Sequence, residues 1–382
     1  MKRQNNTFIY LCVILITLIL LSMLSIYASA TFKSSGLQKS ISAKSAVLYE
    51  PTNNEFLYVK NGDQRLPMAS TTKIMTAIVA SKSCDMNDTV IIGPESVGIE
   101  GSSAYLREGD EYTVMELLYA LMLQSANDAA VTLAYYIAGD LDSFAEMMNQ
   151  EAAALGLKNT HFTNPHGLYD DDHYTTAKDL AIIGAELMKN DILRQVVATH
   201  KKTFTYGDRC RTYINHNKLL TMYDGAIGIK TGYTKKSGRC LVGAAEQDGV
   251  VLISVTLDAP SDWHDHMALF DYGFESLERF QLCSEGDYKK QIPVLGGKTE
   301  YVSVSAKENR WIIKEKENNA INEQINVPHY LIAPIKKGDT VGSVVYRVGD
   351  KIYTVDLIAD EAVSSNLKDN SIFTKVLKKI FR

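Results

Sequence analysis

Hydrophobic and polar positions along this chain follow different periods in different stretches, and the changes of period outline its elements. Around residues 45–60, two short apolar runs, SAVLYE and EFLYVK, flank PTNN, a pattern typical of a β-hairpin. From about Ser70 to Asn190 the apolar residues recur every three to four positions, in segments such as TVMELLYALMLQ, DAAVTLAYYIAG and TAKDLAIIGAELMK, which predict helices. From Gly225 the period becomes that of strands, in GAIGIKTGY, RCLVGAAEQ and GVVLISVTLD.

Strands at both ends of a block of helices indicate an α+β domain. We expect one antiparallel sheet, assembled from both ends of residues 38–282, with a helix over HDHMALFDYGFESLERF closing the unit. Residues 285–363 contain only short strand-like runs, separated by turns such as GGK, KKGD and VGDK. This second region therefore predicts a small all-β sandwich.

The first 30 residues predict export. Lys2 and Arg3 precede a long apolar run that ends in ASA, a small-x-small cleavage pattern, so residues 1–30 are typical of a signal peptide. The alternative is an uncleaved anchor, because the apolar run is long enough to span a bilayer. In either case the remainder of the chain is exported.

Residues 366–382 predict an amphipathic helix. On a helix the apolar residues share one half and the basic residues fill the other; the two sets are Ile372, Phe373, Val376, Leu377, Ile380 and Phe381, and Lys375, Lys378, Lys379 and Arg382. A basic amphipathic helix suits an anionic membrane surface, so we expect it to anchor the exported protein to the membrane. The alternative is a terminal helix that packs on its own β-domain.

The overall composition excludes some functions. The chain has 382 residues, of which 46% are hydrophobic and 22% charged, an ordinary globular composition with room for two domains. Its formal net charge of -5 gives no basic excess for a nucleic acid, so we expect no nucleic-acid partner.

Cysteine and histidine positions do not predict a metal site. No CxxC or CxxxC spacing occurs, and His264 and His266 lie two apart without an evident third ligand, so we expect neither a metal nor another cofactor. Export permits a disulfide, and Cys210 and Cys240, which flank the same sheet region, are the first pair to test. The alternative is that the four cysteines after the export segment are free buried thiols.

The first candidate for chemistry is PMASTTKIMTAIVAS, in which Ser70 and Lys73 lie three apart and share a face of a predicted helix. If the helix begins near Ser70, its positive end stabilises a developing oxyanion. A lysine among apolar neighbours loses hydration and shifts toward the neutral amine, which can take the serine's proton. Alone the motif is weak, since Ser365 and Lys368 repeat it in a polar tail; the alternative is a helix-start serine beside a snorkelling lysine.

The second candidate is a polar break between two strongly apolar helices, in LLYALMLQSANDAAVTLAYYIAG. Ser125 could pass a proton there, and Asn127 could hydrogen-bond a substrate amide. The alternative is that Ser125, Asn127 or Asp128 only caps the second helix.

The third candidate is GIKTGYTKKSG, on a strand just before a turn. Lys230 and Thr231 can bind a carboxylate, one through its charge and the other through its hydroxyl. Gly232 lets a ligand lie close to the backbone, and the N–H of Tyr233 can help to bind an oxyanion. The alternative is an exposed strand lysine beside a turn.

Together, Ser-x-x-Lys, Ser-x-Asn and Lys-Thr-Gly, in this order on a helix, a loop and a strand, are the signature of penicillin-binding proteins and class A β-lactamases. The sequence resembles the low-molecular-mass penicillin-binding proteins that are serine-type D-alanyl-D-alanine carboxypeptidases. The segments LPMASTTKIMTA, EGSSAYLREGDEYTVMELLYALMLQSANDAA, FTNPHGLYDDDHYTTAKDLA and DGAIGIKTGYT carry the resemblance, which covers nearly the whole chain after the export segment. It implies a penicillin-binding/β-lactamase-like transpeptidase domain followed by the β-domain.

The resemblance also implies an activity and its catalytic residues. The enzyme would remove the terminal D-Ala from peptidoglycan stem peptides ending in D-Ala-D-Ala, at the extracytoplasmic face of the bacterial cell membrane. Ser70 would be acylated, Lys73 would activate it, and Ser125 would carry the proton to the leaving amine. β-Lactam antibiotics resemble this substrate and should acylate Ser70 as well.

The substrate-binding roles follow from the same resemblance. Asn127 would orient the peptide, and Lys230 and Thr231 would hold its terminal carboxylate. The N–H groups of Ser70 and Tyr233 would form the oxyanion hole, with Gly232 leaving space beside the strand.

Some positions depart from the family pattern. Many relatives have glycine at Ala126, where one methyl group should be tolerated in a loop. Some have an arginine where this chain has His216, and another in the segment APSDWHDHMALF, so carboxylate recognition should depend more on Lys230.

Two alternative functions share parts of this signature. A class A-like β-lactamase should carry a deacylating glutamate in the loop FTNPHGLYDDDHYTT, which has none. A catalytically dead cell-wall binding module is disfavoured, because every reacting residue is present.

Overall fold

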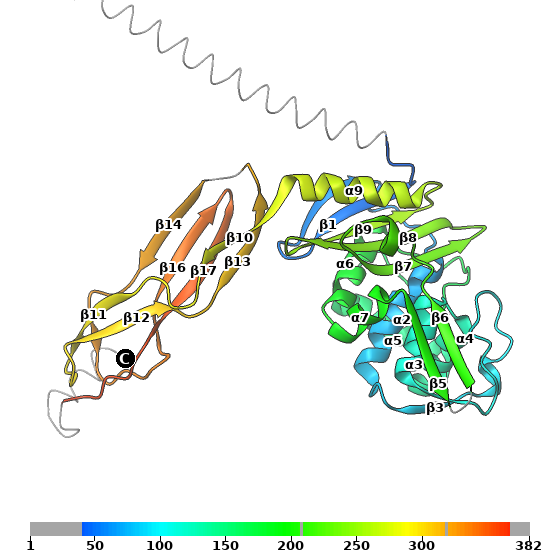
Figure 1. Cartoon of the computed structure of the whole chain (residues 1–382), viewed down its shortest axis with the longest axis horizontal. Coiled ribbons are helices and arrows are strands. Elements are labelled where there is room, and N and C mark those ends of the chain that lie inside the picture. Colours follow the sequence, from blue (N-terminus) through cyan, green and yellow to red (C-terminus); the bar gives the residue numbers. More distant parts are fainter. Residues whose placement is uncertain (1–39, 207–208, 318–319, 367–382) are drawn as a thin grey trace, which may run out of the picture. The chain divides into compact units, whose positions relative to one another are not determined.

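The computed structural model describes residues 40–206, 209–317 and 320–366 of the chain, in two compact units (Figure 1). The first unit contains the described residues up to Gln247 and Val251–Gly273; the second contains Asp248–Val250 and the described residues from Phe274. The signal segment 1–30 and, except for Asn366, the amphipathic segment 366–382 lie outside the described residues, and both stay predictions. Within the described ranges, no helix has both the length and the apolar character needed to cross a membrane.

The first unit and the helix that leads out of it contain the following elements, in chain order: β1 (Ser45–Glu50), β2 (Glu55–Lys60), the 3₁₀ helix η1 (Ala69–Thr72), α2 (Lys73–Ser83), β3 (Thr89–Ile91), the 3₁₀ helix η2 (Pro94–Ser96), β4 (Glu111–Thr113), α3 (Val114–Leu123), α4 (Asn127–Ala138), α5 (Leu141–Ala154), α6 (Ala177–Met188), α7 (Asp191–Ala198), β5 (Lys201–Tyr206), β6 (Arg209–Ile214), α8 (Leu219–Met222), β7 (Ala226–Thr234), β8 (Gly238–Gln247), β9 (Val250–Leu257) and α9 (Asp262–Ser276).

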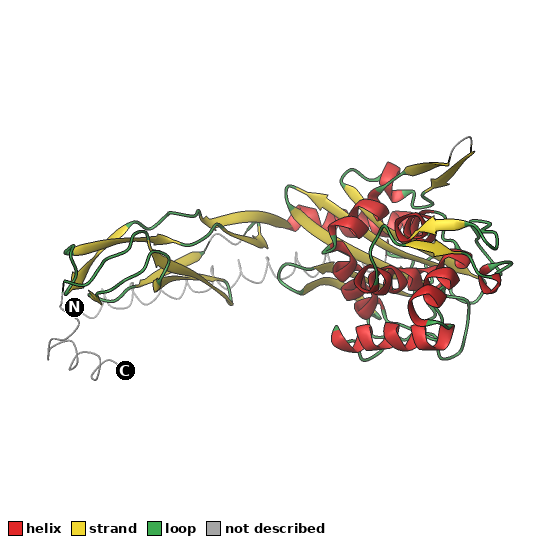
Figure 2. Ribbon diagram, turned by 90° about the horizontal axis from the view of Figure 1, so that it is seen from below, coloured by secondary structure: helices red, strands yellow, loops and turns green. Residues whose placement is uncertain are grey.

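A five-stranded sheet in the order β2-β1-β9-β8-β7 forms the middle of the first unit. The early hairpin β1–β2 pairs antiparallel with the late strand β9, so the predicted assembly of one sheet from both ends of the segment is confirmed. Successive residues of β9 face opposite sides, as strand geometry requires. Leu252 lies against Gly273 of α9, whereas Ile253 lies against Gly184 of α6. The sheet is therefore covered on one face by α9 and on the other by the helical block (Figure 1); Figure 2 shows the same elements coloured by secondary structure.

Helix α2 lies inside the helical block, in contact with α3, α4, α5 and α6. Every residue from Lys73 to Ala80 is buried, because a helix that is apolar on nearly all sides is stable only when other elements surround it. The sequence thus places the ionisable amine of Lys73 in the core of the domain, at the start of its central helix.

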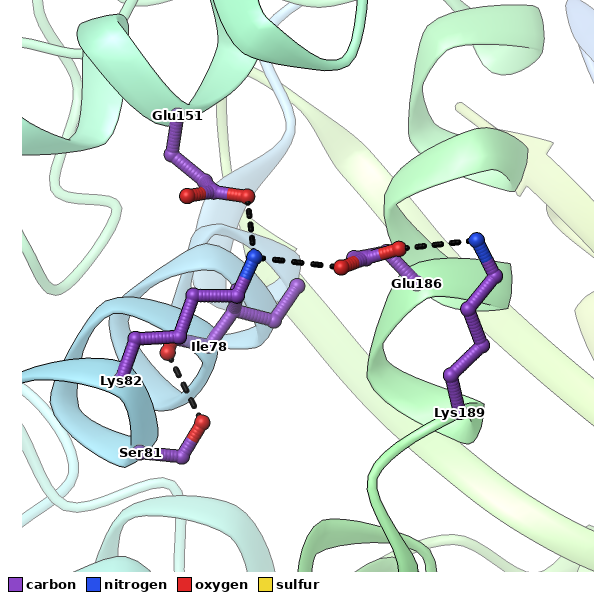
Figure 3. Close-up of polar contacts among 6 residues, drawn as sticks. All are labelled: Ile78, Ser81, Lys82, Glu151, Glu186 and Lys189. Atoms are coloured by element: carbon purple, nitrogen blue, oxygen red, sulfur yellow. Dashed lines mark hydrogen bonds and ion pairs between the residues drawn. The ribbon is translucent and has the colours of Figure 1, made fainter.

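The other end of α2 reaches the surface at Lys82, whose ammonium bridges two neighbouring helices (Figure 3). Its Nζ lies 2.6 Å from Glu151 Oε1 of α5 and 3.1 Å from Glu186 Oε1 of α6. Glu186 is also paired with Lys189, at 3.0 Å. These carboxylates raise the pKa of Lys82, and the network fixes the exposed end of the helix that begins at Lys73.

We expect Lys82→Ala to lower the free energy of unfolding by only about 1 kcal/mol or less, because exposed ion pairs in water contribute little. The Lys82 side chain is 48% exposed. Urea denaturation measures the change, and Lys189→Ala, which removes a 74% exposed partner, should have a smaller effect. A loss of several kcal/mol for Lys82→Ala would contradict this account.

The second unit consists of strands: β10 (Leu277–Cys283), β11 (Lys290–Leu295), β12 (Tyr301–Ala306), β13 (Arg310–Glu315), β14 (Ile321–Asn326), β15 (Leu331–Ile332), β16 (Thr340–Val348) and β17 (Lys351–Ala359). β10 pairs with β13, and the others form a sheet in the order β14-β16-β17-β12-β11-β15. The alternating pattern of strands such as β11 buries Ile292 and Val294 and exposes Pro293 and Leu295. The predicted all-β character of this region is confirmed.

Two details differ from the sequence-based expectations. The helix predicted through Phe280 ends at Ser276, and β10 begins at Leu277 because this segment pairs with the distant strand β13. The proposed Cys210–Cys240 disulfide is absent, and all four cysteines in the described ranges are free. Cys210 lies in the hairpin β5–β6 and Cys240 in the central sheet, so they are not on a common sheet. The alternative of four buried thiols is also wrong, since Cys210 is exposed.

Candidate active site

Ser70 lies in the 3₁₀ helix η1, which leads directly into α2. It is partly buried, and its Oγ lies 3.1 Å from Lys73 Nζ. Ala69, just before it, has a φ of 48°, in the left-handed region that non-glycine residues rarely adopt. The expected geometry of a serine at a helix start beside a buried lysine is therefore present.

Lys73 is fully buried, and its Nζ has three oxygen partners. Besides Ser70 Oγ, it lies 2.7 Å from Asn127 Oδ1 and 2.6 Å from the backbone oxygen of His166. Burial lowers the pKa of Lys73 well below its usual range, and the nearby charge of Lys230 lowers it further. The charge of Asp128 raises this pKa, but by less. The neutral amine is thus favoured at this position.

The partners of Lys73 suit a neutral amine that accepts a proton from Ser70. The amide oxygen of Asn127 and the carbonyl of His166 are acceptors only, so they take the two N–H groups that a neutral amine has. The remaining lone pair is then free for the hydroxyl of Ser70, which can donate. The arrangement therefore orients the lysine as a general base toward one particular hydroxyl.

The loop between α3 and α4 supplies Ser125 and Asn127. Ser125 is buried and has a φ of 59°, whereas Ala126 has a φ of -66°, so the latter position does not require glycine, as expected. The alternative that Ser125, Asn127 or Asp128 caps α4 is wrong, because the helix begins at Asn127 without a side-chain cap. Within the described ranges, the Ser125 hydroxyl forms no hydrogen bond with Lys73, whereas the side-chain oxygen of Asn127 accepts one from Lys73 Nζ.

Asp128 anchors the neighbouring loop instead. Its carboxylate accepts hydrogen bonds from Ser103 Oγ at 2.6 Å, Ala104 N at 3.0 Å and Leu106 N at 3.1 Å. The N–H of Asn127 donates to the oxygen of Ser102 at 2.7 Å. The two residues together fix the start of α4 against residues 102–106.

The segment from Phe162 to Thr176 forms another side of the site, although none of its residues is among the sequence-predicted site residues. Its His166 carbonyl receives the Lys73 amine, and Pro165 O accepts from Thr76 Oγ1 of α2 at 2.6 Å. Gly167 has a φ of 86°, and a Cβ there would lie only 2.0 Å from the oxygen of Ala69. This glycine is required for the loop to approach the nucleophile turn so closely.

A buried histidine in the same segment supports the backbone beside Ser70. The N–H of Thr163 donates to His173 Nδ1 at 3.0 Å, so Nε2 carries the hydrogen and donates to Thr72 Oγ1 at 2.7 Å. Thr72 in turn donates to the oxygen of Ala69 at 2.8 Å. Burial lowers the pKa of His173 to about 4, so this chain of hydrogen bonds is neutral at physiological pH.

Strand β7, the edge strand of the sheet, places Lys-Thr-Gly beside the nucleophile. A Cβ on Gly232 would lie 3.0 Å from the N of Ser70, which shows how closely the strand passes η1. Lys230 is 1% exposed, and its Nζ donates to the oxygen of Thr231 at 2.9 Å. Tyr233 is 66% exposed. The alternative of an exposed strand lysine is therefore wrong.

The charge of Lys230 affects its surroundings. Burial lowers the pKa of Lys230 to about 7. Burial and the charge of Lys230 also lower the pKa of His216, the residue that stands where some relatives have arginine. His216 thus lies within electrostatic range of the candidate carboxylate-binding lysine.

Acyl transfer by a serine nucleophile is the chemistry that this arrangement supports. Ser70, Lys73, Asn127 and Gly232 converge on one point, from a helix start, a loop and a sheet edge. Within the described ranges, no group of three His, Cys, Asp or Glu side chains could hold a metal ion.

Comparison with known proteins identifies the family. Residues 31–261 match the family model described as D-alanyl-D-alanine carboxypeptidase, and residues 277–365 match the C-terminal domain of penicillin-binding protein 5. The chain is similar to D-alanyl-D-alanine carboxypeptidase DacF of Bacillus subtilis, with 32% identity over 91% of this chain and 93% of the relative. The chain is also similar to D-alanyl-D-alanine carboxypeptidase DacC of Escherichia coli, with 31% identity over 88% of this chain and 87% of the relative.

Solved structures agree with these matches. Penicillin-binding protein 5 of Haemophilus influenzae aligns with a TM-score of 0.67 and 30% identity, over 85% of this chain and 98% of that one. The chain belongs to the D-alanyl-D-alanine carboxypeptidase family. The fold class and the family indicated by the sequence motifs are thereby confirmed.

Proposed function

We propose that this protein is a serine-type D-alanyl-D-alanine carboxypeptidase, which removes the terminal D-Ala from peptidoglycan pentapeptides through an acyl-enzyme on Ser70. The observation that carries the proposal is the buried Lys73 amine, whose two acceptor partners leave its lone pair to the Ser70 hydroxyl. Membership of the family supports the substrate class.

In the acylation step, Ser70 Oγ attacks the carbonyl carbon of the penultimate D-Ala while its proton passes to Lys73 Nζ. The N–H groups of Ser70 and Tyr233 stabilise the oxyanion of the tetrahedral intermediate. Ser125 passes the proton from the Lys73 ammonium to the leaving amine, so that its own hydroxyl and the neutral Lys73 amine are restored; the peptide bond breaks and free D-Ala departs. A water molecule then hydrolyses the ester and restores the Ser70 hydroxyl.

Substrate binding depends on β7 and the loop before α4. Protonated Lys230 and the Thr231 hydroxyl hold the terminal carboxylate, and Asn127 orients the peptide. β7 is an edge strand, so its free side can pair with an extended peptide backbone. The absence of a side chain at Gly232 leaves room for that peptide.

β-Lactams present a carboxylate and a strained acyl group to the same residues and are therefore covalent inhibitors of this enzyme. The competing function is a class A-like β-lactamase, which needs a carboxylate to activate the deacylating water. Within the described ranges, no aspartate or glutamate forms a hydrogen bond with Ser70 or Lys73. A non-catalytic wall-binding module would not need a neutral, buried lysine such as Lys73 beside a serine hydroxyl.

Turnover separates these functions. The protein should release D-alanine repeatedly from a peptide ending in D-Ala-D-Ala, while penicillin should be hydrolysed much more slowly than it acylates. Rapid penicillin turnover without D-alanine release would instead identify a lactamase, and inertness toward both would identify a binding module.

The expected location fits this substrate. The signal-peptide pattern of residues 1–30 exports the protein, and the basic amphipathic segment 366–382 attaches it to the extracytoplasmic face of the cell membrane. Peptidoglycan stem peptides occur on that side.

A further inference from the structure

The second unit carries apolar side chains on the outer face of three neighbouring strands. Pro293 of β11 pairs with Tyr301 of β12, and Leu295 pairs with Ile332 of β15. Tyr330 immediately precedes β15, so the same register places it beside Pro293. Directly opposed residues share a face of a sheet, and β11 alternates so that Ile292 and Val294 face the core. Pro293, Leu295, Tyr301, Tyr330 and Ile332 therefore form one outer patch.

The outer patch is accessible to water. Leu295 is 52% exposed, Tyr301 51% and Tyr330 45%. Single exposed apolar residues are common on soluble proteins, but neighbouring ones on one face of a sheet usually mark a contact surface.

Basic residues border the same strands. Lys298 is in the turn between β11 and β12, and Lys336 and Lys337 follow β15; all three are exposed. Glu300 also lies in that turn, and the carboxylate of Asp339 accepts a hydrogen bond from the N–H of Lys336. The three lysines thus place ammonium groups beside the apolar and aromatic side chains of the outer patch.

The last described residues run along this end of the unit. Gly297 and Ser365 form an antiparallel bridge, and Lys298 N donates to Ser364 O at 2.9 Å. Asn366 N donates to Gly296 O at 2.8 Å, and its side chain donates to Gly297 O at 3.1 Å. Asn366 therefore lies beside the turn that follows Leu295. The basic and apolar sequence 367–382 continues the chain from that point.

We infer that the outer patch is a membrane-docking surface, which lies on an anionic lipid bilayer together with the basic C-terminal segment. Tyrosine suits this interface because its ring is apolar and its hydroxyl polar, and lysines extend their ammonium groups to lipid phosphates. A single weak anchor gives only marginal, reversible binding, so a second contact close to the first makes attachment stable. This inference does not depend on the chemistry at Ser70.

Depth-dependent quenching tests the inference in residues 31–382. Tyr301→Trp should place an indole in the bilayer, so vesicles of phosphatidylglycerol and phosphatidylcholine with brominated acyl chains should quench its added fluorescence by about half. Ile352→Trp is the matched control, because Ile352 is 63% exposed near the start of β17 in the same unit. Equal quenching at the two positions, or none at position 301, would overturn the inference.

Sedimentation with the same vesicles, without bromine, measures the contribution of the patch to binding. Combined Leu295→Ser, Tyr301→Ser and Tyr330→Ser should weaken partitioning about tenfold, because three partly buried apolar contacts are lost. Ile352→Ser should leave it unchanged. If the triple variant instead alters the oligomeric state in lipid-free solution and binds vesicles normally, the patch is a protein–protein interface and the inference is wrong.

Discussion

Replacing Ser70 with alanine is expected to abolish covalent labelling by penicillin and to lower D-alanine release by at least about 10⁴-fold, because the proposed ester forms on the Ser70 hydroxyl. The mutation removes one oxygen from a partly buried position and leaves the amine of Lys73 its partners at Asn127 and His166. The fold should therefore persist, with a change in melting temperature of a few degrees at most. Mass spectrometry of the intact protein after penicillin treatment measures the adduct.

The matched control for this prediction is Ser365→Ala. Ser365 begins the second Ser-x-x-Lys of the chain, but it lies in the second unit, in a β-bridge with Gly297. Its replacement should leave the adduct and its rate unchanged. An adduct that survives Ser70→Ala, or one that maps to another residue, would refute the assignment of the nucleophile.

The positions of the candidate catalytic motifs are predictable from the sequence because each motif consists of side chains whose chemistry is specific. Ser70, Lys73 and Lys230 are polar residues in apolar or strand-like surroundings, where burial is costly unless they are paired, so their presence there indicates a function. The structure buries both lysines nearly completely. For Lys73 this burial favours the neutral amine that the proposed general base requires.

Backbone contributions to the site were not predictable. The carbonyl of His166 is one of three partners of Lys73, but a carbonyl is present in every residue and leaves no mark in the sequence. The one local signal was Gly167, because a positive φ favours glycine. The role of Asp128 was also missed, since helix capping is the commoner role of an aspartate beside a helix start.

Long-range pairing limited the fold prediction in the same way. The β1–β2 hairpin is local, and its turn predicts it, whereas the start of β10 resembles a continuation of α9 because its pairing partner β13 lies far along the chain. The hairpin β5–β6 was not predicted either. Its strands carry charged and polar residues at positions where a buried strand would be apolar.

Replacing Lys73 with methionine is expected to lower the rate of acylation by penicillin about 10³-fold while Ser70 remains in place, because general-base catalysis contributes on the order of 10²- to 10⁴-fold. Methionine preserves most of the volume but leaves the buried oxygens of Asn127 and His166 without a donor. We expect the free energy of unfolding to decrease by about 1–3 kcal/mol for each of these oxygens that finds no new donor. Circular dichroism would show that the variant is folded.

Lys82→Met is the matched control, on the same helix and also a lysine, but 48% exposed at the surface. It should label at the normal rate. If Lys73→Met also labelled at the normal rate, Lys73 would not be the base, and the Ser70 proton would have to leave by another route.

The pH dependence of kcat/KM follows from the two lysines, with opposite signs. Lys73 must be neutral to accept the Ser70 proton, so activity rises with pH through a pKa that burial and the charge of Lys230 hold well below the usual lysine range. Lys230 must be protonated to bind the substrate carboxylate, so activity falls above its pKa of about 7. The expected profile is bell-shaped, with its alkaline limb centred near pH 7 and its acid limb set by Lys73.

Lys230→Arg separates the two limbs, because a guanidinium stays protonated throughout this range. The alkaline limb should disappear or move to much higher pH, while the acid limb stays as long as Lys73 is intact. Measuring acylation by penicillin from about pH 5 to pH 10 in both proteins gives the comparison. An unchanged alkaline limb in Lys230→Arg would show that another group controls it, and carboxylate recognition would then have to depend on other residues of the site.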